Sequence, residues 1–170
     1  RLTFGDGQPG NCTAFAVAPR LFATAAHCVT DASATFRLQD EQGRQWPAQV
    51  LYFNSVIDVA TLQSEMAAQP LALGEDPHED EVVASMNGVG GSGLWSLRGR
   101  SAGRDAAYLM VQLPGHGPGG SGSPLLCGPD YKVCGILLGR FFAGDIAVAL
   151  SVSAWRDALK AHEEPPTVVK

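Results

Sequence analysis

The sequence of 170 residues contains no run of about 20 apolar residues, the length that an α-helix needs to span a bilayer. It also has no cluster of basic residues, and its formal net charge is −5. Proteins that bind nucleic acid through its phosphates carry a basic surface, so the composition argues against a nucleic-acid partner. The opening RLTFGDGQPG lacks the apolar core of a signal peptide. We therefore predict no membrane span, and we expect that any export signal has already been removed.

Long helical periodicity is also scarce, which argues against an alternating β-α-β fold. Short runs of β-branched and aromatic residues instead recur between Gly, Pro, Asn and Asp, as in CTAFAVA, LFATAAH, QWPAQVLYF and VCGILLGRFF. This rhythm is typical of strands and turns. With 45% hydrophobic residues the chain can bury a core, and we predict an all-β protein.

The sequence has only four cysteines, Cys12, Cys28, Cys127 and Cys134. Three pairings into two disulfides are formally possible, and the pairing that closes two sequence-local loops keeps each bond within its own half of the chain. Disulfides favour an oxidising compartment, so we expect a secreted or periplasmic protein. A zinc site using His27 is the rival interpretation. It is disfavoured because neither cysteine spacing matches the short spacing of structural zinc sites.

An acidic stretch in the middle of the chain, GEDPHEDE, predicts a solvated connector between two β lobes. A calcium site there is conceivable but less favoured. The predicted organisation is an N-terminal β lobe over 1–75, an acidic connector over 76–81, a C-terminal β lobe over 82–153, a helix over 154–162 and a tail over 163–170.

The helix is predicted from the segment SAWRDALKAH, in which Trp155, Ala158, Leu159 and His162 recur at helical spacing. Ser153 precedes them as an expected N-cap. We expect this helix to pack one face onto the second lobe.

The segment GPGGSGSP at 117–124 raises the question of catalysis. Closely flanking apolar strands argue against a flexible linker, and a phosphate-binding loop is disfavoured because no lysine follows and no helix begins there. A glycine-rich turn around Ser121 provides backbone N–H groups for an oxyanion. Two other residues fit serine chemistry: His27, in ATAAHCV, as a base, and Asp58, in VIDVATL, as the carboxylate that orients it.

The segments TAAHC at 24–28, DVATL at 58–62 and GGSGSP at 119–124 resemble the chymotrypsin-like, or trypsin-type, serine proteases. Cys12, 16 residues before Cys28, is similar to the family's disulfide beside its histidine. The resemblance implies two six-stranded antiparallel β-barrels with a short C-terminal helix. It places the catalytic residues in the cleft between the barrels.

Carried onto this sequence, the resemblance implies that Ser121 is the nucleophile, His27 the general base and acid, and Asp58 the carboxylate that fixes the imidazole. The backbone N–H groups of Gly119 and Ser121 would form the oxyanion hole. It further implies disulfides Cys12–Cys28 and Cys127–Cys134. No metal or organic cofactor is expected, and the partners would be protein or peptide substrates.

Several residues depart from the animal trypsin-like pattern. Gly120 stands where those enzymes carry an aspartate that pairs with a new N-terminus, so activation of that type is not expected. The ending through Ser123 is more similar to the bacterial glutamyl endopeptidases and high-temperature-requirement proteases, as are the short spacings, 58 − 27 = 31 and 121 − 58 = 63. The glycine-rich segment 86–99 also resembles glutamyl endopeptidases, but the histidine of their GIHWG segment is Leu137 here.

The expected substrate pocket gives conflicting indications. Gly115 replaces the aspartate that selects lysine and arginine in trypsins. His116 and Arg140 favour an acidic P1 side chain, whereas Asp145 favours a basic one, and a small or apolar P1 residue stays open. Leu138 replaces a serine that many relatives place near the catalytic aspartate, which predicts lower activity than in trypsin.

These inferences predict a serine endopeptidase that acts through an acyl-enzyme. The alternative is a weak or inactive pseudoprotease that binds peptide by strand addition along residues 136–140. The oligomeric state is not predicted.

Overall fold

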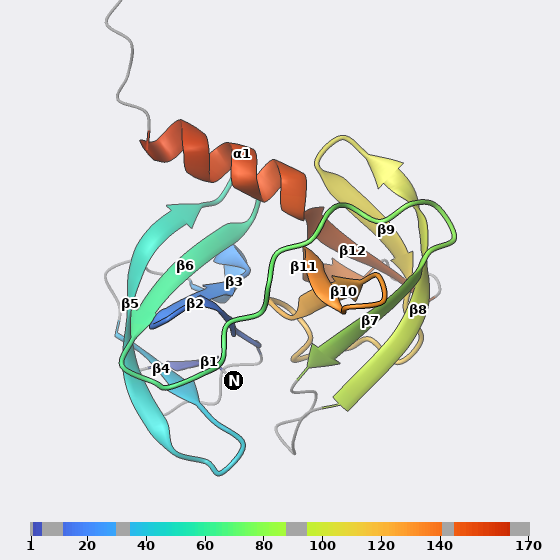
Figure 1. Cartoon of the computed structure of the whole chain (residues 1–170). Helices are drawn as coiled ribbons and strands as arrows, with labels where there is room; N and C mark the ends of the chain where they lie inside the picture. Colours follow the sequence, from blue (N-terminus) through green and yellow to red (C-terminus); the bar gives the residue numbers. More distant parts are fainter. Residues whose placement is uncertain (1, 5–11, 30–34, 88–94, 141–144, 164–170) are drawn as a thin grey trace, which may run out of the picture.

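The computed structural model describes residues 2–4, 12–29, 35–87, 95–140 and 145–163. The strands of these residues gather in two β lobes, and an α-helix follows them at the end of the described chain (Figure 1). The strands of the first lobe are β1 (Leu2–Phe4), β2 (Phe15–Ala18), β3 (Leu21–Thr24), β4 (Phe36–Gln39), β5 (Gln45–Asn54) and β6 (Val59–Ser64). The strands of the second lobe are β7 (Val82–Asn87), β8 (Trp95–Asp105), β9 (Tyr108–Gln112), β10 (Pro124–Cys127), β11 (Lys132–Arg140) and β12 (Ile146–Ser151). The predicted tail beyond residue 163 and the centre of the 86–99 segment lie outside the described residues.

The first lobe is a six-stranded antiparallel sheet with the strand order β1-β4-β5-β6-β3-β2. β4 alternates buried and half-buried residues, as expected for a strand with one face on a core. Phe22, Phe36, Leu38 and Leu62 are buried together in that core. A 3-10 turn, η1 (Ala26–Cys28), follows β3.

The second lobe is a closed barrel with the strand order β10-β11-β12-β9-β8-β7. Its core contains Val83, Leu109, Val111 and Leu125. Each strand of the barrel pairs with two neighbours over part of its length, and every pairing is antiparallel. The predicted all-β fold of two six-stranded antiparallel barrels with a C-terminal helix is confirmed, with a closed barrel in the second lobe and the described strands of the first lobe forming a six-stranded sheet.

A third apolar cluster joins the lobes. Phe15 and Val59 of the first lobe pack with Ile136 and Leu150 of the second. Trp155, 1% exposed, meets the ring of Phe15 edge-on, with 6.5 Å between the ring centroids. Burial of these side chains stabilises the arrangement of the two lobes as well as each lobe.

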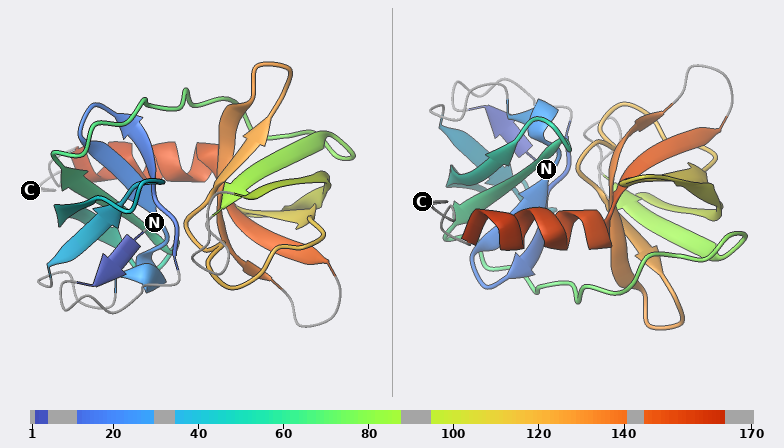
Figure 2. Two further views of the ribbon diagram at one scale, coloured as in Figure 1. Left: turned by 90° about the horizontal axis from the view of Figure 1, so that it is seen from below. Right: turned by 90° about the horizontal axis from the view of Figure 1, so that it is seen from above.

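The helix α1 (Val152–Glu163) begins two residues before its predicted start. The N–H of Ala154 donates to Ser151 Oγ at 3.2 Å, the contact that an N-cap makes. The prediction of Ser153 as the cap is therefore wrong. The helix packs on the second lobe as expected, because Trp155 lies in one cluster with Ile136 and Leu150. Figure 2 shows that it also runs along the first lobe, where Trp155 meets Phe15.

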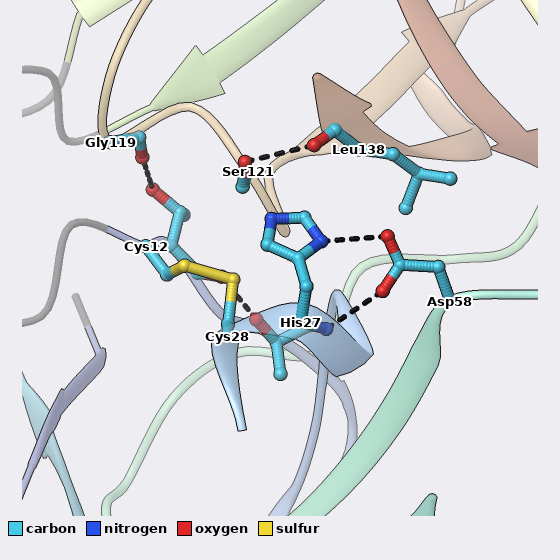
Figure 3. The surroundings of a disulfide bond; sticks show 9 residues. Cys12, His27, Cys28, Asp58, Gly119, Ser121 and Leu138 are labelled. Carbon is cyan, nitrogen blue, oxygen red and sulfur yellow. Dashed lines mark hydrogen bonds and ion pairs between the residues drawn. A yellow bond between two sulfur atoms is a disulfide. The ribbon is translucent and has the colours of Figure 1, made fainter. Parts of the chain in front are cut away.

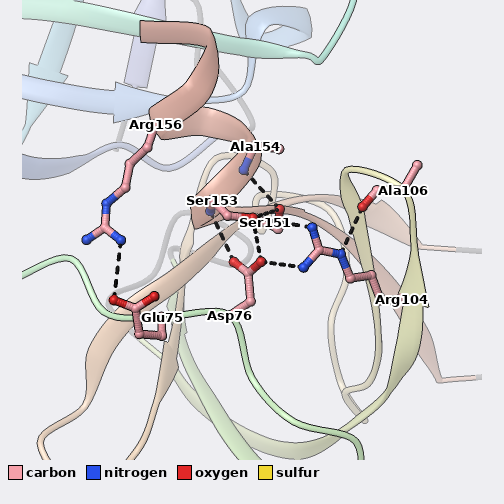
Figure 4. A network of polar contacts seen from close by, with 8 residues as sticks. All are labelled: Glu75, Asp76, Arg104, Ala106, Ser151, Ser153, Ala154 and Arg156. Carbon is pink, nitrogen blue, oxygen red and sulfur yellow. Dashed lines mark hydrogen bonds and ion pairs between the residues drawn. The ribbon is translucent and has the colours of Figure 1, made fainter. Parts of the chain in front are cut away.

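The acidic connector is more than a solvated link. Asp76 accepts hydrogen bonds from the N–H and the Oγ of Ser153, at 3.1 and 2.5 Å, and pairs with Arg104 at 2.6 Å (Figure 4). Asp76 thus satisfies an N–H in the first turn of α1, where a negative charge is favourable. The exact division of the chain into lobes and connector stays a prediction.

Candidate active site

His27 lies in the middle of the 3-10 turn η1, between the buried residues Ala26 and Cys28. Burial of these two neighbours fixes the turn on the core and leaves the His27 side chain 46% exposed. Cys28 is bonded to Cys12, which ties the turn to the segment before β2. The sequence thus anchors the histidine through its neighbours, so that its ring is held at the surface facing the second lobe (Figure 3).

Asp58 ends the turn between β5 and β6 and has a left-handed backbone, with φ of +58°. Aspartate tolerates this conformation better than most residues. Asn54 Oδ1 accepts hydrogen bonds from the N–H groups of Val56 and Ile57, which shapes the turn. The apolar run around Asp58 is therefore not one buried strand: Val56 is exposed and β6 begins at Val59.

The Asp58 carboxylate binds His27 through both oxygens. Oδ2 lies 2.7 Å from the ring Nδ1, and Oδ1 accepts the His27 backbone N–H at 2.8 Å. This bond raises the pKa of His27 above its usual 6.5, burial opposes the rise, and the Asp58 charge adds to it. The contact favours a proton on Nδ1 and leaves the second ring nitrogen as an acceptor.

Ser121 lies in the loop between β9 and β10. Its Oγ donates to the carbonyl of Leu138 at 2.9 Å, and Figure 3 shows its side chain beside the His27 ring. Leu138 is the extra residue of a bulge in β11, where Leu137 and Gly139 face successive residues of β12. The bulge frees the Leu138 carbonyl from the ladder. Within the residues that the structure describes, Ser121 makes no hydrogen bond to His27.

Close approach of the lobes requires glycine after the serine. A Cβ on Gly122 would lie 2.2 Å from the carbonyl oxygen of Thr13 and 2.3 Å from Thr24 Oγ1. Gly122 also has φ of +79°, so both space and conformation exclude larger residues.

Thr13 is a contributor that sequence reasoning missed. Its N–H donates to the Ser121 carbonyl at 2.8 Å, and its Oγ1 donates to the Gly119 carbonyl at 2.8 Å. Thr24 Oγ1 in turn donates to the Thr13 carbonyl at 2.8 Å. The first lobe therefore holds the serine loop of the second lobe from both ends of the Gly119–Ser121 turn.

Within the described part of the chain, the backbone N–H groups of Gly119 and Ser121 donate to no backbone carbonyl. The N–H groups of their neighbours are paired. The Gly120 N–H donates to the Gly117 carbonyl at 3.0 Å, and the Gly122 N–H donates to the Leu137 carbonyl at 2.7 Å. Unpaired N–H groups in a well-bonded loop are open to a ligand oxygen.

The predicted pocket residues lie on both sides of this loop. His116 is buried, and Arg140 Nη1 lies 3.4 Å from its carbonyl oxygen. Gly115 has φ of +82° and packs near Leu97. Asp145 is exposed, and its carbonyl accepts the Leu113 N–H at 2.7 Å. The structure thus brings His116 and Arg140 together.

Both expected disulfides, Cys12–Cys28 and Cys127–Cys134, are present. Within the described ranges, the single group of three possible metal ligands is Cys12, His27 and Cys28. Its two sulfurs are already bonded to each other, so they offer no thiolate and the zinc interpretation does not fit. No α-helix in the described residues is long and apolar enough to cross a membrane.

The fold and this loop geometry define a two-lobed β protein with a histidine, a carboxylate and a serine at the junction of its lobes. A family model described as the trypsin-like peptidase domain matches residues 12–136. The chain belongs to this family, and the predicted resemblance is confirmed. The nearer kinship with particular bacterial branches stays a prediction.

Solved structures support the fold. The chain is similar to the Rv3671c protease in an inactive form, with 19% identity, a TM-score of 0.75 and coverage of 88% of this chain and 82% of that one. It is also similar to an inactive serine-to-alanine mutant of Rv3671c from M. tuberculosis, with 18% identity, a TM-score of 0.81 and coverage of 99% and 87%.

A serine endoprotease from Yersinia pestis has 17% identity and a TM-score of 0.78. The match covers 88% of this chain but 56% of that protein. No curated protein sequence matches the chain significantly.

Proposed function

We propose that this protein is a serine endopeptidase that cleaves peptide bonds through an acyl-enzyme on Ser121. The observation that carries the proposal is the double contact of Asp58 with His27, at 2.7 and 2.8 Å, beside Ser121. A carboxylate that fixes the imidazole tautomer leaves the other ring nitrogen ready to accept the serine proton. Membership of the trypsin-like peptidase family supports the same chemistry.

In the proposed reaction, His27 accepts the proton of Ser121 Oγ while the Oγ–C bond to the substrate carbonyl forms. The tetrahedral intermediate collapses when the C–N bond breaks and His27 returns the proton to the leaving amine. Water, activated by His27, then hydrolyses the ester. Before attack, Ser121 Oγ breaks its hydrogen bond to the Leu138 carbonyl and turns to the imidazole of His27. Hydrogen bonds between catalytic groups often form fully only when substrate binds.

The oxyanion of the intermediate would accept the two unpaired N–H groups of Gly119 and Ser121. Loss of one such donor costs about 10²–10³ in kcat in related chemistry. Thr13 holds both ends of this turn through its hydrogen bonds to the Gly119 and Ser121 carbonyls. These contacts support the proposal, because N–H donors that are already fixed stabilise an oxyanion more than donors that must first be ordered.

Protein or peptide substrates would bind in an extended form beside β11. The N–H of Leu137 donates to the carbonyl of Ser123. Among the described residues, the part of β11 that follows Leu137 pairs with β12 alone. The other edge of residues 138–140 is thus suited to strand addition by a peptide. The two disulfides favour a secreted or periplasmic protein.

A pseudoprotease that binds peptide without cleaving it is the second candidate. The hydrogen bond of Ser121 Oγ to the Leu138 carbonyl, rather than to His27, favours it. In that case residues 138–140 of β11 would bind a peptide by strand addition, while Ser121 stayed unreactive.

A fluorophosphonate probe at neutral pH separates the two candidates, because it labels an activated serine only. We expect labelling of the wild type and none of Ser121→Ala. Ser123→Ala is the matched control: Ser123 is a buried serine two residues away, and its variant should still be labelled. Absence of wild-type labelling, or labelling that survives Ser121→Ala, would refute the endopeptidase, and peptide binding without labelling would establish the pseudoprotease.

A further inference from the structure

Gly120, directly before Ser121, lies against the imidazole ring of His116. A Cβ atom on Gly120 would be 2.4 Å from Cε1 and 2.7 Å from Nδ1 of that ring, and 3.0 Å from the carbonyl oxygen of Gly117. Gly119 and Gly122, on either side, have a positive φ, whereas Gly120 is not among the residues with one. The glycine is therefore required for space, and the His116 ring fills the volume that a side chain at position 120 would occupy.

The side chain of His116 is buried, and its backbone is hydrogen-bonded on both sides. It is 5% exposed, its N–H donates to the Leu113 carbonyl at 3.2 Å, and its carbonyl accepts Arg140 at 3.4 Å. In the described part of the molecule, the buried Nδ1 has no hydrogen-bond partner. A buried polar atom without a partner is unfavourable, so a phenyl ring would fill the site at less cost unless the imidazole has a function.

The turn that carries the unpaired N–H groups has two other supports. Thr13 holds the Gly119 carbonyl from the first lobe, and Leu137 accepts the Gly122 N–H within the second. The His116 ring is a third support on the remaining side, at Gly120.

We propose that His116 is a positioning residue, whose imidazole packs against Gly120 and fixes the Gly119–Ser121 turn with its two N–H groups aimed at the oxyanion. The inference rests on the proposed function, because it assigns His116 a role relative to the oxyanion. It gives His116 a task distinct from selecting the P1 side chain.

The neutral form of the ring matters to this role. Burial, and then the charge of Arg140, lower the pKa of His116 below its usual value. Among the described residues, Arg140 on β11 is the one whose charge acts on this ring, and its Nη1 lies 3.4 Å from the backbone carbonyl oxygen of His116. Protonation would add a second positive charge to a buried site beside Arg140 and so loosen the turn.

A double-mutant cycle tests the contact. With a peptide substrate that the wild type cleaves, Gly120→Ala should lower kcat by about 100-fold or more, the cost of losing an oxyanion donor, with KM changed much less. In a His116→Ala background the same substitution should cost less than about tenfold, because the two shortest contacts are removed and the 3.0 Å approach to the Gly117 carbonyl oxygen remains. Gly117→Ala is the matched control from the same turn: its Cβ would meet nothing within 4 Å, and its cost should be far smaller.

Costs of Gly120→Ala that are equal in both backgrounds would overturn the proposal. Thermal unfolding of each variant verifies that it is folded. If a variant proves unfolded, the pH experiment decides, because it uses the wild type and a ring-conserving variant.

The pH profile separates positioning by a neutral ring from simple packing. Below the pKa of His27, log kcat/KM of the wild type should fall with a slope of one, steepening to two once His116 also gains a proton. His116→Phe keeps a planar ring without a titrating nitrogen and should show a slope of one throughout. A wild-type slope that never exceeds one would refute the role of the neutral ring.

The two proposals fail in different ways. If the fluorophosphonate probe does not label the wild type, the endopeptidase is refuted and this inference falls with it. If the wild type is labelled but the cycle shows no coupling and the slopes coincide, only the role of His116 is refuted.

Discussion

The contact between Asp58 and His27 links the geometry of two residues to the pH at which the protein would work. His27 must be neutral to accept a proton, and the bond to Asp58 raises its pKa. A raised pKa means that the ring is still half protonated at a pH above 6.5. Activity should therefore fall as the pH decreases through a midpoint above 6.5.

Asp58→Asn tests this assignment. The variant should lower kcat by about 10⁴-fold, because the amide no longer fixes the required tautomer. The acid midpoint of kcat/KM should also move to lower pH, since both contributions of Asp58 to the raised pKa are lost. Rate measurements from pH 4 to 9 on wild type and variant check both effects, and an unchanged midpoint would show that Asp58 does not set the His27 titration.

Single residues differ in how far the sequence could predict them. His27, Asp58 and Ser121 stand in local segments whose residue types already point to serine chemistry, and the structure brings them to one place. Thr13 contacts Gly119 across 106 residues of sequence, and a threonine after a cysteine has no local pattern that indicates such a partner. The sequence does not predict the contact of His116 with Gly120 either, because this contact depends on the direction in which the His116 ring points.

At the scale of elements, the start of α1 depends on a residue from the connector. Asp76 is 14% exposed and accepts from Ser153 and Arg104, whereas its neighbour Glu75 is 93% exposed and lies 3.7 Å from Arg156. Charge-assisted, partly buried hydrogen bonds stabilise far more than an exposed ion pair.

Substitution of these two neighbours separates the effects. Asp76→Asn should lower the free energy of unfolding by about 1–3 kcal/mol, because the amide cannot replace both charged acceptors. Glu75→Gln should change it by less than about 1 kcal/mol. Urea unfolding measures both values, and equal losses would contradict the anchoring role of Asp76.

The same region explains why the sequence predicted the helix but not its exact start. The periodicity of Trp155, Ala158 and Leu159 identifies the helix. Ser151 and Ser153 are both suitable caps by residue type, and only the position of Asp76 decides that Ser153 lies inside the first turn. A run of acidic residues predicts a solvated connector by composition, which carries no information about a distant partner such as Arg104.

For the whole molecule, each covalent cross-link lies within one lobe. Cys12–Cys28 closes 16 residues of the first lobe and Cys127–Cys134 closes 7 residues of the second. The lobes are held to each other by packing, chiefly around Trp155, and by the hydrogen bonds of Thr13.

Removal of each disulfide should therefore destabilise its own lobe. By loop-closure entropy, Cys12→Ser with Cys28→Ser should cost about 3.1 kcal/mol, and the second pair about 2.4 kcal/mol. The first pair should also lower activity more, because Cys28 adjoins His27. Unfolding and rate measurements on both double variants check this order, and a greater loss of activity from the second pair would contradict it.

The order of the chain through the two lobes has a practical consequence. His27 and Asp58 precede the exposed stretch around Ala67, and Ser121 follows it, so a break there would give two fragments, neither with a complete set of proposed catalytic groups. Hydrolysis would return only when the fragments reassemble through the packing around Trp155. The fold thus offers a split reporter, in which turnover measures the association of whatever partners are fused to the two halves.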